Sequence, residues 1–161
     1  MKILFVCTGN TCRSYMAETL MKDLVKKAAS SGLISENAIM VESAGLFVVE
    51  ETANNKAVSV MEEEFGIKTE KHAARQITRE LIEDSDLILT MTDRHKRAIL
   101  DAFPVYKDKI YTLLEYAYPE TTVVDIQDPY GGDRQDYFES AVSINNAIKA
   151  MFYKLIEEME K

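Results

Sequence analysis

Residues 3–14 read Ile3-Leu4-Phe5-Val6-Cys7-Thr8-Gly9-Asn10-Thr11-Cys12-Arg13-Ser14, and this stretch decides the fold. Its first five residues form a β-branched and aromatic run, which is typical of a buried parallel strand. A turn containing Gly9 follows, and from Met16 apolar residues recur at helical spacing until Gly32, which is placed as a helix stop. The stretch therefore predicts a tight loop that joins a strand to a helix.

The rest of the chain continues this alternation. Strand patterns occupy residues 39–42, 86–91 and 109–113, while helical patterns occupy 53–65, a short stretch after Thr78, 92–102 and a long C-terminal segment from about Tyr137. Alternating strands and helices imply parallel strands with right-handed crossovers and helices on both sheet faces. We therefore predict an α/β fold, a small doubly wound domain with a four-stranded parallel sheet flanked by helices. No linker or repeat divides the chain, so we expect one domain over residues 1–161.

Composition restricts the classes of partner. The formal net charge of −8 argues against a general affinity for nucleic acid or for an anionic membrane. The apolar run at the N-terminus is too short for a signal peptide or a membrane span, so we expect a soluble, cytoplasmic protein. The two cysteines cannot staple a secreted domain, and His72 and His95 lie far apart in the chain. We expect no metal and no cofactor.

The loop between the first strand and helix has the features of an anion site. Five residues, Thr8, Gly9, Asn10, Thr11 and Cys12, separate Cys7 from Arg13. Their backbone N–H groups can point inward beside a helix N-terminus, and the planar guanidinium of an arginine can hold two phosphate oxygens. The same field favours a thiolate, which is an activated nucleophile toward phosphorus. We therefore expect residues 8–13 to bind phosphate and Cys7 and Arg13 to be catalytic; the alternative is a buried apolar thiol beside an unrelated surface arginine.

This loop resembles the signature of the low-molecular-weight protein tyrosine phosphatase family, Cys-x-Gly-Asn-x-Cys-Arg-Ser-Pro. Further stretches resemble the family's landmarks in their usual order, namely Ser43-Ala44-Gly45, His72 with Arg75, the strand at 86–91 and Asp128-Pro129-Tyr130. The resemblance covers the whole chain and implies a phosphatase that forms a phosphocysteine. It also implies a supporting role for four polar residues that brace the loop by hydrogen bonds: Asn10, Ser14, Ser43 and His72.

One position departs from this signature. The family proline after the signature serine is Tyr15 here. Proline suits a first helical turn because its φ is preset and its missing N–H has no partner there. We expect Tyr15 to weaken this pre-organisation, to alter the mouth of the pocket and to lower activity.

The third expected catalytic residue is Asp128. It lies in the longest irregular segment, residues 118–134, beside a stiffening Pro129 and a flexible Gly131-Gly132 pair. Departure of a group from phosphorus is easier when an acid protonates it, and in the resembling family the Asp-Pro-aromatic motif holds that acid. From the dipeptide alone, Asp128 opening an ordinary turn is the alternative.

The substrate is expected to be a phosphorylated protein. Tyrosine-directed members of the family usually carry an aliphatic residue at the position of Thr11, whereas members that resemble protein arginine phosphatases carry threonine. A hydroxyl there can hydrogen-bond to a guanidinium, so phosphoarginine is favoured and phosphotyrosine is the alternative; Thr11 can also be an ordinary loop residue that caps local backbone. We expect Thr11, Phe47 and Tyr130 to form the substrate pocket.

Two other classes remain as alternatives. An arsenate reductase also opens with a Cys-x5-Arg loop, but it usually needs further cysteines and none follows Cys12. A non-catalytic phosphoprotein-binding module is favoured only by Tyr15. Cys12 itself has two interpretations, since it can pack beneath the loop or form a protective disulfide with Cys7 under oxidants.

Overall fold

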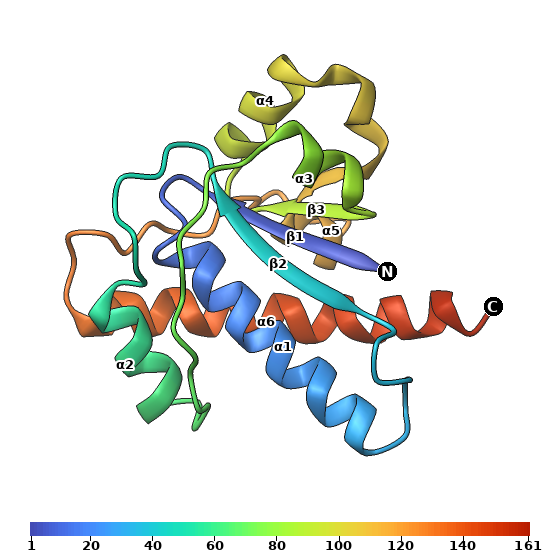
Figure 1. The fold of residues 1–161 in the computed structure, drawn as a ribbon, viewed down its shortest axis with the longest axis horizontal. Helices are drawn as coiled ribbons and strands as arrows, with labels where there is room; N and C mark the ends of the chain where they lie inside the picture. Colours follow the sequence, from blue (N-terminus) through green and yellow to red (C-terminus); the bar gives the residue numbers. More distant parts are fainter.

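In the computed structural model, which describes residues 1–161, helices cover both faces of a single sheet (Figure 1). The strands are β1 (Lys2–Cys7), β2 (Met40–Gly45), β3 (Leu87–Thr90) and β4 (Ile110–Thr112). The α-helices are α1 (Arg13–Ser30), α2 (Asn55–Glu63), α3 (Arg79–Asp84), α4 (Asp93–Ala102), α5 (Leu113–Ala117) and α6 (Arg134–Met159), and a 3₁₀-helix, η1 (Pro104–Lys109), precedes β4. No helix is both long enough and apolar enough to span a membrane.

The sheet is entirely parallel, with the strand order β2-β1-β3-β4. This confirms the predicted four-stranded α/β architecture. In the register, Cys7 at the end of β1 lies beside Gly45 of β2, and Val6 lies beside Thr90 of β3. The carboxyl ends of three strands therefore meet around Cys7, which is where open α/β sheets bind ligands.

Alternation along β1 divides the core between the two faces of the sheet. Ile3 and Phe5 pack in the larger cluster, which includes apolar residues of α1 and α6, whereas Leu4 and Val6 pack in a smaller cluster with residues of α3 and α4. All four side chains are fully buried, and each such burial contributes about 1.5–3 kcal/mol. Figure 1 shows α1 and α6 together on one side of the sheet and α3 and α4 on the other. Both faces of β1 are thus fixed, and so is the position where its loop begins.

Helix caps explain where the expected element boundaries differ from the structure. The last predicted strand ends at Thr112, because Thr112 and Glu115 form a capping box that starts the unpredicted helix α5. A second capping box, between Asp133 and Asp136, starts α6 three residues before the expected Tyr137. β2 also runs on to Gly45, three residues beyond the predicted end. Residues 118–133 remain outside helices and strands, as expected.

Candidate active site

The β1–α1 loop, residues 8–12, turns its carbonyl groups toward the protein. The carbonyl oxygens of Cys7, Thr8 and Thr11 accept backbone N–H groups of Leu46, Phe47 and Asn54 at 2.8–3.0 Å, and the Cys12 carbonyl accepts from Met16. By contrast, no backbone N–H of residues 8–12 donates to an acceptor within the protein. Five successive donors beside the N-terminus of α1 are therefore free, which is the arrangement that binds anions.

Asn10 fixes the shape of this loop. It is the only non-glycine residue with positive φ, at 60°, and its side chain is fully buried. The Asn10 Nδ2 donates to Ser14 Oγ at 2.9 Å and to Ser43 Oγ at 2.8 Å, while the Asn10 Oδ1 accepts from the N–H of Arg75 at 3.0 Å. These bonds join the loop to α1, to β2 and to the segment before α3, so they hold Asn10 in a conformation that costs other residues about 1–2 kcal/mol.

The same network gives Cys7 a defined hydrogen-bond partner. Ser14 Oγ lies 2.9 Å from Cys7 Sγ. Because Ser14 already accepts a hydrogen bond from Asn10, its own hydroxyl hydrogen is free to donate to the sulfur. Cys7 is 3% exposed, so this donor faces a sulfur atom that has little water around it.

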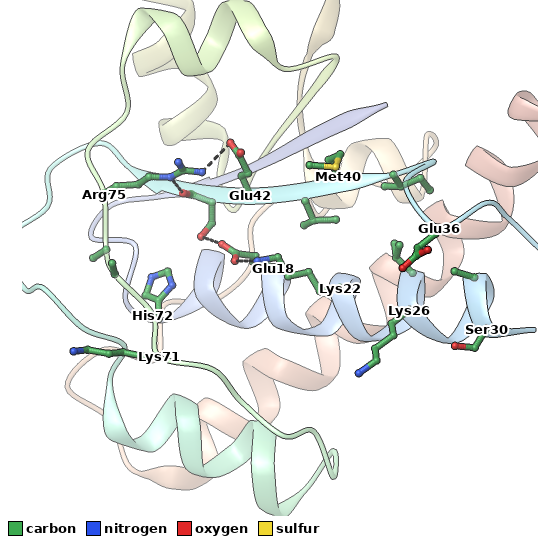
Figure 2. A pocket seen from close by; sticks show the side chains of 17 residues that line it. Glu18, Lys22, Lys26, Ser30, Glu36, Met40, Glu42, Lys71, His72 and Arg75 are labelled. Carbon is green, nitrogen blue, oxygen red and sulfur yellow. Dashed lines mark hydrogen bonds and ion pairs between the residues drawn. The ribbon is translucent and has the colours of Figure 1, made fainter.

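A second layer of side chains supports the network from behind (Figure 2). His72 Nε2 donates to the Asn10 carbonyl at 2.7 Å, and Ser43 Oγ donates to Glu18, which also pairs with Lys22. Arg75 lies across β2, where its Nε donates to the Ser43 carbonyl and its Nη2 pairs with Glu42 at 2.8 Å. The hollow drawn in Figure 2, about 1030 Å³ in volume, lies beside these residues and contains neither Cys7 nor Arg13.

Gly45 shows why β2 approaches the loop so closely. A Cβ atom at this position would lie 2.7 Å from the Thr8 carbonyl oxygen and 3.0 Å from the Asn10 nitrogen. Both are backbone atoms of the loop, so a side chain at residue 45 would displace it. In the sequence Ser43-Ala44-Gly45, the Ser43 hydroxyl therefore accepts a hydrogen bond from Asn10, and Gly45 leaves the space that the loop needs.

Arg13 connects the loop to the segment that carries Asp128. Its Nη1 donates to the Ile126 carbonyl at 2.9 Å, and its Nη2 lies 3.5 Å from Asp128 Oδ2. The other carboxylate oxygen of Asp128 accepts the N–H of Tyr130 at 3.0 Å. The arginine side chain is buried, but that of Asp128 is 56% exposed, so this carboxylate faces the entrance.

A pocket of about 240 Å³ opens above Cys7. Its outer part, the rim, consists of Phe47, Val49, Glu50 and Tyr130, of which Phe47 is 69% and Tyr130 63% exposed. The rim is joined across the pocket by a hydrogen bond of 3.3 Å from Tyr130 O–H to Glu50 Oε1. The remaining lining residues are Cys7, Thr8, Gly9, Thr11, Cys12, Arg13 and Asp128.

Most residues expected from the sequence meet here. The pocket above Cys7 is lined by all the residues expected to be catalytic or to form the substrate pocket: Cys7, Arg13, Asp128, Thr11, Phe47 and Tyr130. Asn10 does not line it, so of the loop residues expected to bind phosphate, it offers only its backbone N–H. Ser14, Ser43 and His72 also lie behind the loop, in contact with Asn10 or Cys7. No group of three or more His, Cys, Asp or Glu side chains is arranged to hold a metal ion.

His95 is a residue of the site that the sequence analysis missed. It is buried in the first turn of α4, with its Nε2 2.9 Å from the Thr8 hydroxyl. Burial first, and the charge of Arg13 second, lower the pKa of His95 to about 4, so the ring is neutral near pH 7. Its position just after β3 was the available signal, because side chains at the carboxyl ends of parallel strands converge.

Tyr15 and Cys12 both lie inside the protein. The expectation that Tyr15 alters the pocket mouth is wrong, since its ring is 3% exposed and packs 4.9 Å from His72, outside the pocket lining. Cys12 is buried and its Sγ lies 3.5 Å from the hydroxyl of Tyr137. Burial raises the pKa of the Cys12 thiol, and both cysteines are free thiols.

Comparisons with known proteins agree with this geometry. Over 160 residues the chain is 34% identical to a protein-arginine-phosphatase of Bacillus subtilis, covering 96% of this chain and 97% of that protein. It is 36% identical over 151 residues to the low molecular weight protein-tyrosine-phosphatase PtpB of Staphylococcus aureus, covering 89% of this chain and 94% of PtpB.

A solved structure has the same fold over nearly its whole length. The YwlE arginine phosphatase from Geobacillus stearothermophilus superposes with a TM-score of 0.84 at 35% identity, covering 98% of this chain and 94% of that one. The model of the family described as low molecular weight phosphotyrosine protein phosphatase matches residues 2–161. The chain therefore belongs to this family of cysteine-dependent protein phosphatases.

Proposed function

We propose that this phosphatase removes the phosphoryl group from phosphoarginine side chains of proteins through a phosphocysteine intermediate. The observation that carries the phosphatase chemistry is the set of free N–H groups in the β1–α1 loop, which begins directly after Cys7. These donors match the three equatorial oxygens of a phosphoryl group in the transition state. Arg13 adds the positive charge.

In the first step the Cys7 thiolate attacks phosphorus in line with the leaving nitrogen. An S–P bond forms, the P–N bond breaks, and Asp128 donates its proton to the departing guanidine. In the second step Asp128 accepts a proton from water, the water oxygen attacks phosphorus, and the S–P bond breaks to return the thiolate and release phosphate. The exposed position of Asp128 above the pocket supports both roles.

Thr11 supports the choice of phosphoarginine. It lines the pocket, and its carbonyl is fixed by the N–H of Asn54, while its Oγ1 has only a weak 3.7 Å contact with Cys12 Sγ. The hydroxyl is therefore available to the substrate. Two relatives named as protein-arginine-phosphatases, each 34% identical, favour the same assignment.

Phosphotyrosine is the second candidate substrate. The exposed faces of Phe47 and Tyr130 and the side chain of Val49 offer apolar surface on which a phenyl ring can pack. The relative PtpB is named as a tyrosine phosphatase at similar identity. Apolar rim contacts serve both substrates, whereas a hydroxyl at residue 11 serves only the guanidinium.

The test compares turnover of phosphoarginine and phosphotyrosine in peptides with the same flanking sequence. We expect the wild type to favour phosphoarginine in kcat/KM, and Thr11→Ile to reverse the preference by removing the hydroxyl and adding apolar surface. Thr11→Ser is the matched control, since it keeps the hydroxyl and should keep the preference. Faster phosphotyrosine hydrolysis by the wild type would reject the arginine assignment and leave the phosphatase chemistry intact.

A further inference from the structure

The pocket is lined by more acidic than basic side chains, which does not suit a phosphate ester that brings only negative charge. The only charged side chains that line it are Arg13, Asp128 and Glu50. Arg13 and Asp128 lie near each other, at 3.5 Å. Glu50 has no cation within ion-pair distance, although it stands at the entrance of a site built for an anion.

The position of Glu50 is held by one contact. Its Oε1 accepts the hydroxyl of Tyr130 at 3.3 Å, which brings the 47–50 segment and the Asp128-Pro129-Tyr130 segment together across the entrance. The second carboxylate oxygen, Oε2, has no hydrogen-bond partner in the protein. An acceptor with full negative charge is thus available at the rim.

Such a carboxylate affects the two candidate substrates in opposite ways. A phosphotyrosine brings a dianion and a neutral ring, so a bare carboxylate at the entrance repels it. A phosphoarginine brings its own positive guanidinium, bonded through nitrogen to the phosphorus. When the phosphoryl group occupies the β1–α1 loop, this cation lies just outside it, on the side of the rim.

We infer that Glu50 is a specificity-determining residue that receives the guanidinium of phosphoarginine, with Tyr130 holding its carboxylate in place. This inference rests on the proposed function and assigns a residue to its selectivity. Thr11 and Glu50 both line the pocket, so the guanidinium would lie between the Thr11 hydroxyl on the inner side and the Glu50 carboxylate on the outer side. The planar N–H donors of a guanidinium suit a carboxylate partner better than a hydroxyl alone does.

The neighbouring Glu51 provides a matched control. It is also exposed and also acidic, but it does not line the pocket and its side chain has no partner. A general effect of negative charge near the site should therefore change equally in Glu50→Gln and Glu51→Gln. A specific effect on the guanidinium should appear only at residue 50.

The experiment measures kcat/KM for matched phosphoarginine and phosphotyrosine peptides with the wild type, Glu50→Gln, Glu50→Lys and Glu51→Gln, at low and high salt. We expect the phosphoarginine-to-phosphotyrosine ratio to fall about two- to fivefold in Glu50→Gln, mainly through KM, and about tenfold in Glu50→Lys. The ratio should stay constant in Glu51→Gln, and the effect at residue 50 should shrink at high salt. An unchanged ratio in Glu50→Gln, or an equal fall in Glu51→Gln, would overturn the inference. The inference is tested by the change in this ratio between variants, whereas the proposed substrate is tested by the ratio of the wild type itself. A wild type that favours phosphotyrosine would therefore reject only the proposed substrate.

Discussion

The β1–α1 loop and the rim bound the same pocket but are built in different ways. Asn10, Thr11 and Cys12 of the loop are buried, and hydrogen bonds hold the loop to β2, to the segment before α3 and to α1. The rim is exposed, and its two segments meet across the pocket through one hydrogen bond, Tyr130 to Glu50. Cys7 and Arg13 are thus held in place by the fold, whereas substitutions at the rim should have little effect on stability.

The largest expected effect is at the centre of the loop. Cys7→Ser removes the nucleophile, so we expect kcat for a phosphopeptide to fall by about 10⁴-fold or more. Inorganic phosphate should still bind in calorimetry, because the N–H groups and Arg13 are unchanged. Cys12→Ser keeps Cys7 and must retain turnover. Sustained turnover by Cys7→Ser would refute the phosphocysteine mechanism.

The next effect concerns the conformation of the loop. Asn10→Ala removes three hydrogen bonds, two of them buried, and places alanine at a φ of 60°, so the free energy of unfolding should fall by about 2–4 kcal/mol. Asn10→Gly also loses the hydrogen bonds but tolerates this φ, so it should be about 1 kcal/mol more stable than Asn10→Ala. Urea denaturation measures both values. A loss below about 0.5 kcal/mol in Asn10→Ala would show that the network does not hold the loop.

A smaller effect depends on pH through His95. Its pKa is about 4 in the folded protein and near 6.5 when unfolded, so between these values the unfolded chain binds more protons. The contribution of neutral His95 is complete above pH 6.5 and is lost as the pH falls through 4, with about 2–3 kcal/mol lost by pH 4.5. His95→Gln lacks this titration. Urea denaturation from pH 7 to pH 4.5 should therefore show a steeper loss for the wild type, and parallel curves would contradict the assignment.

The smallest effect on stability is expected at the rim. Phe47→Ala removes a ring that is 69% exposed, so the free energy of unfolding should change by less than about 0.5 kcal/mol. The ring still offers surface to the substrate, so KM should rise about two- to tenfold. Steady-state kinetics beside urea denaturation separates the two effects. If Phe47→Ala lost much stability without a change in KM, the rim would contribute to the fold and not to substrate binding, contrary to this prediction.

The sequence predicted the loop but only Phe47 and Tyr130 of the four rim residues, for a physical reason. Strand and helix periodicity placed Cys7 and Arg13 at the ends of β1 and α1, and turn chemistry placed Asp128 in an irregular segment. The contact of His95 with Thr8 joins residues 87 positions apart, and that of Glu50 with Tyr130 joins residues 80 positions apart. Neither contact produces a periodic pattern in the sequence, because each depends on how segments distant in the chain pack together. The helix α5 was missed because its one clear signal is a capping box in a stretch read as strand.

The inward N–H groups of the β1–α1 loop also affect how substrate arrives. Amide dipoles act over a few ångströms, whereas a net charge of −8 repels a phosphorylated segment over the full Debye length of about 10 Å at 0.1 M salt. We therefore expect the protein to capture phosphate at contact and to oppose its approach at a distance. Moderate salt should then accelerate the encounter with an acidic phosphoprotein, and segments whose own positive charges surround the phosphorylated residue should arrive fastest.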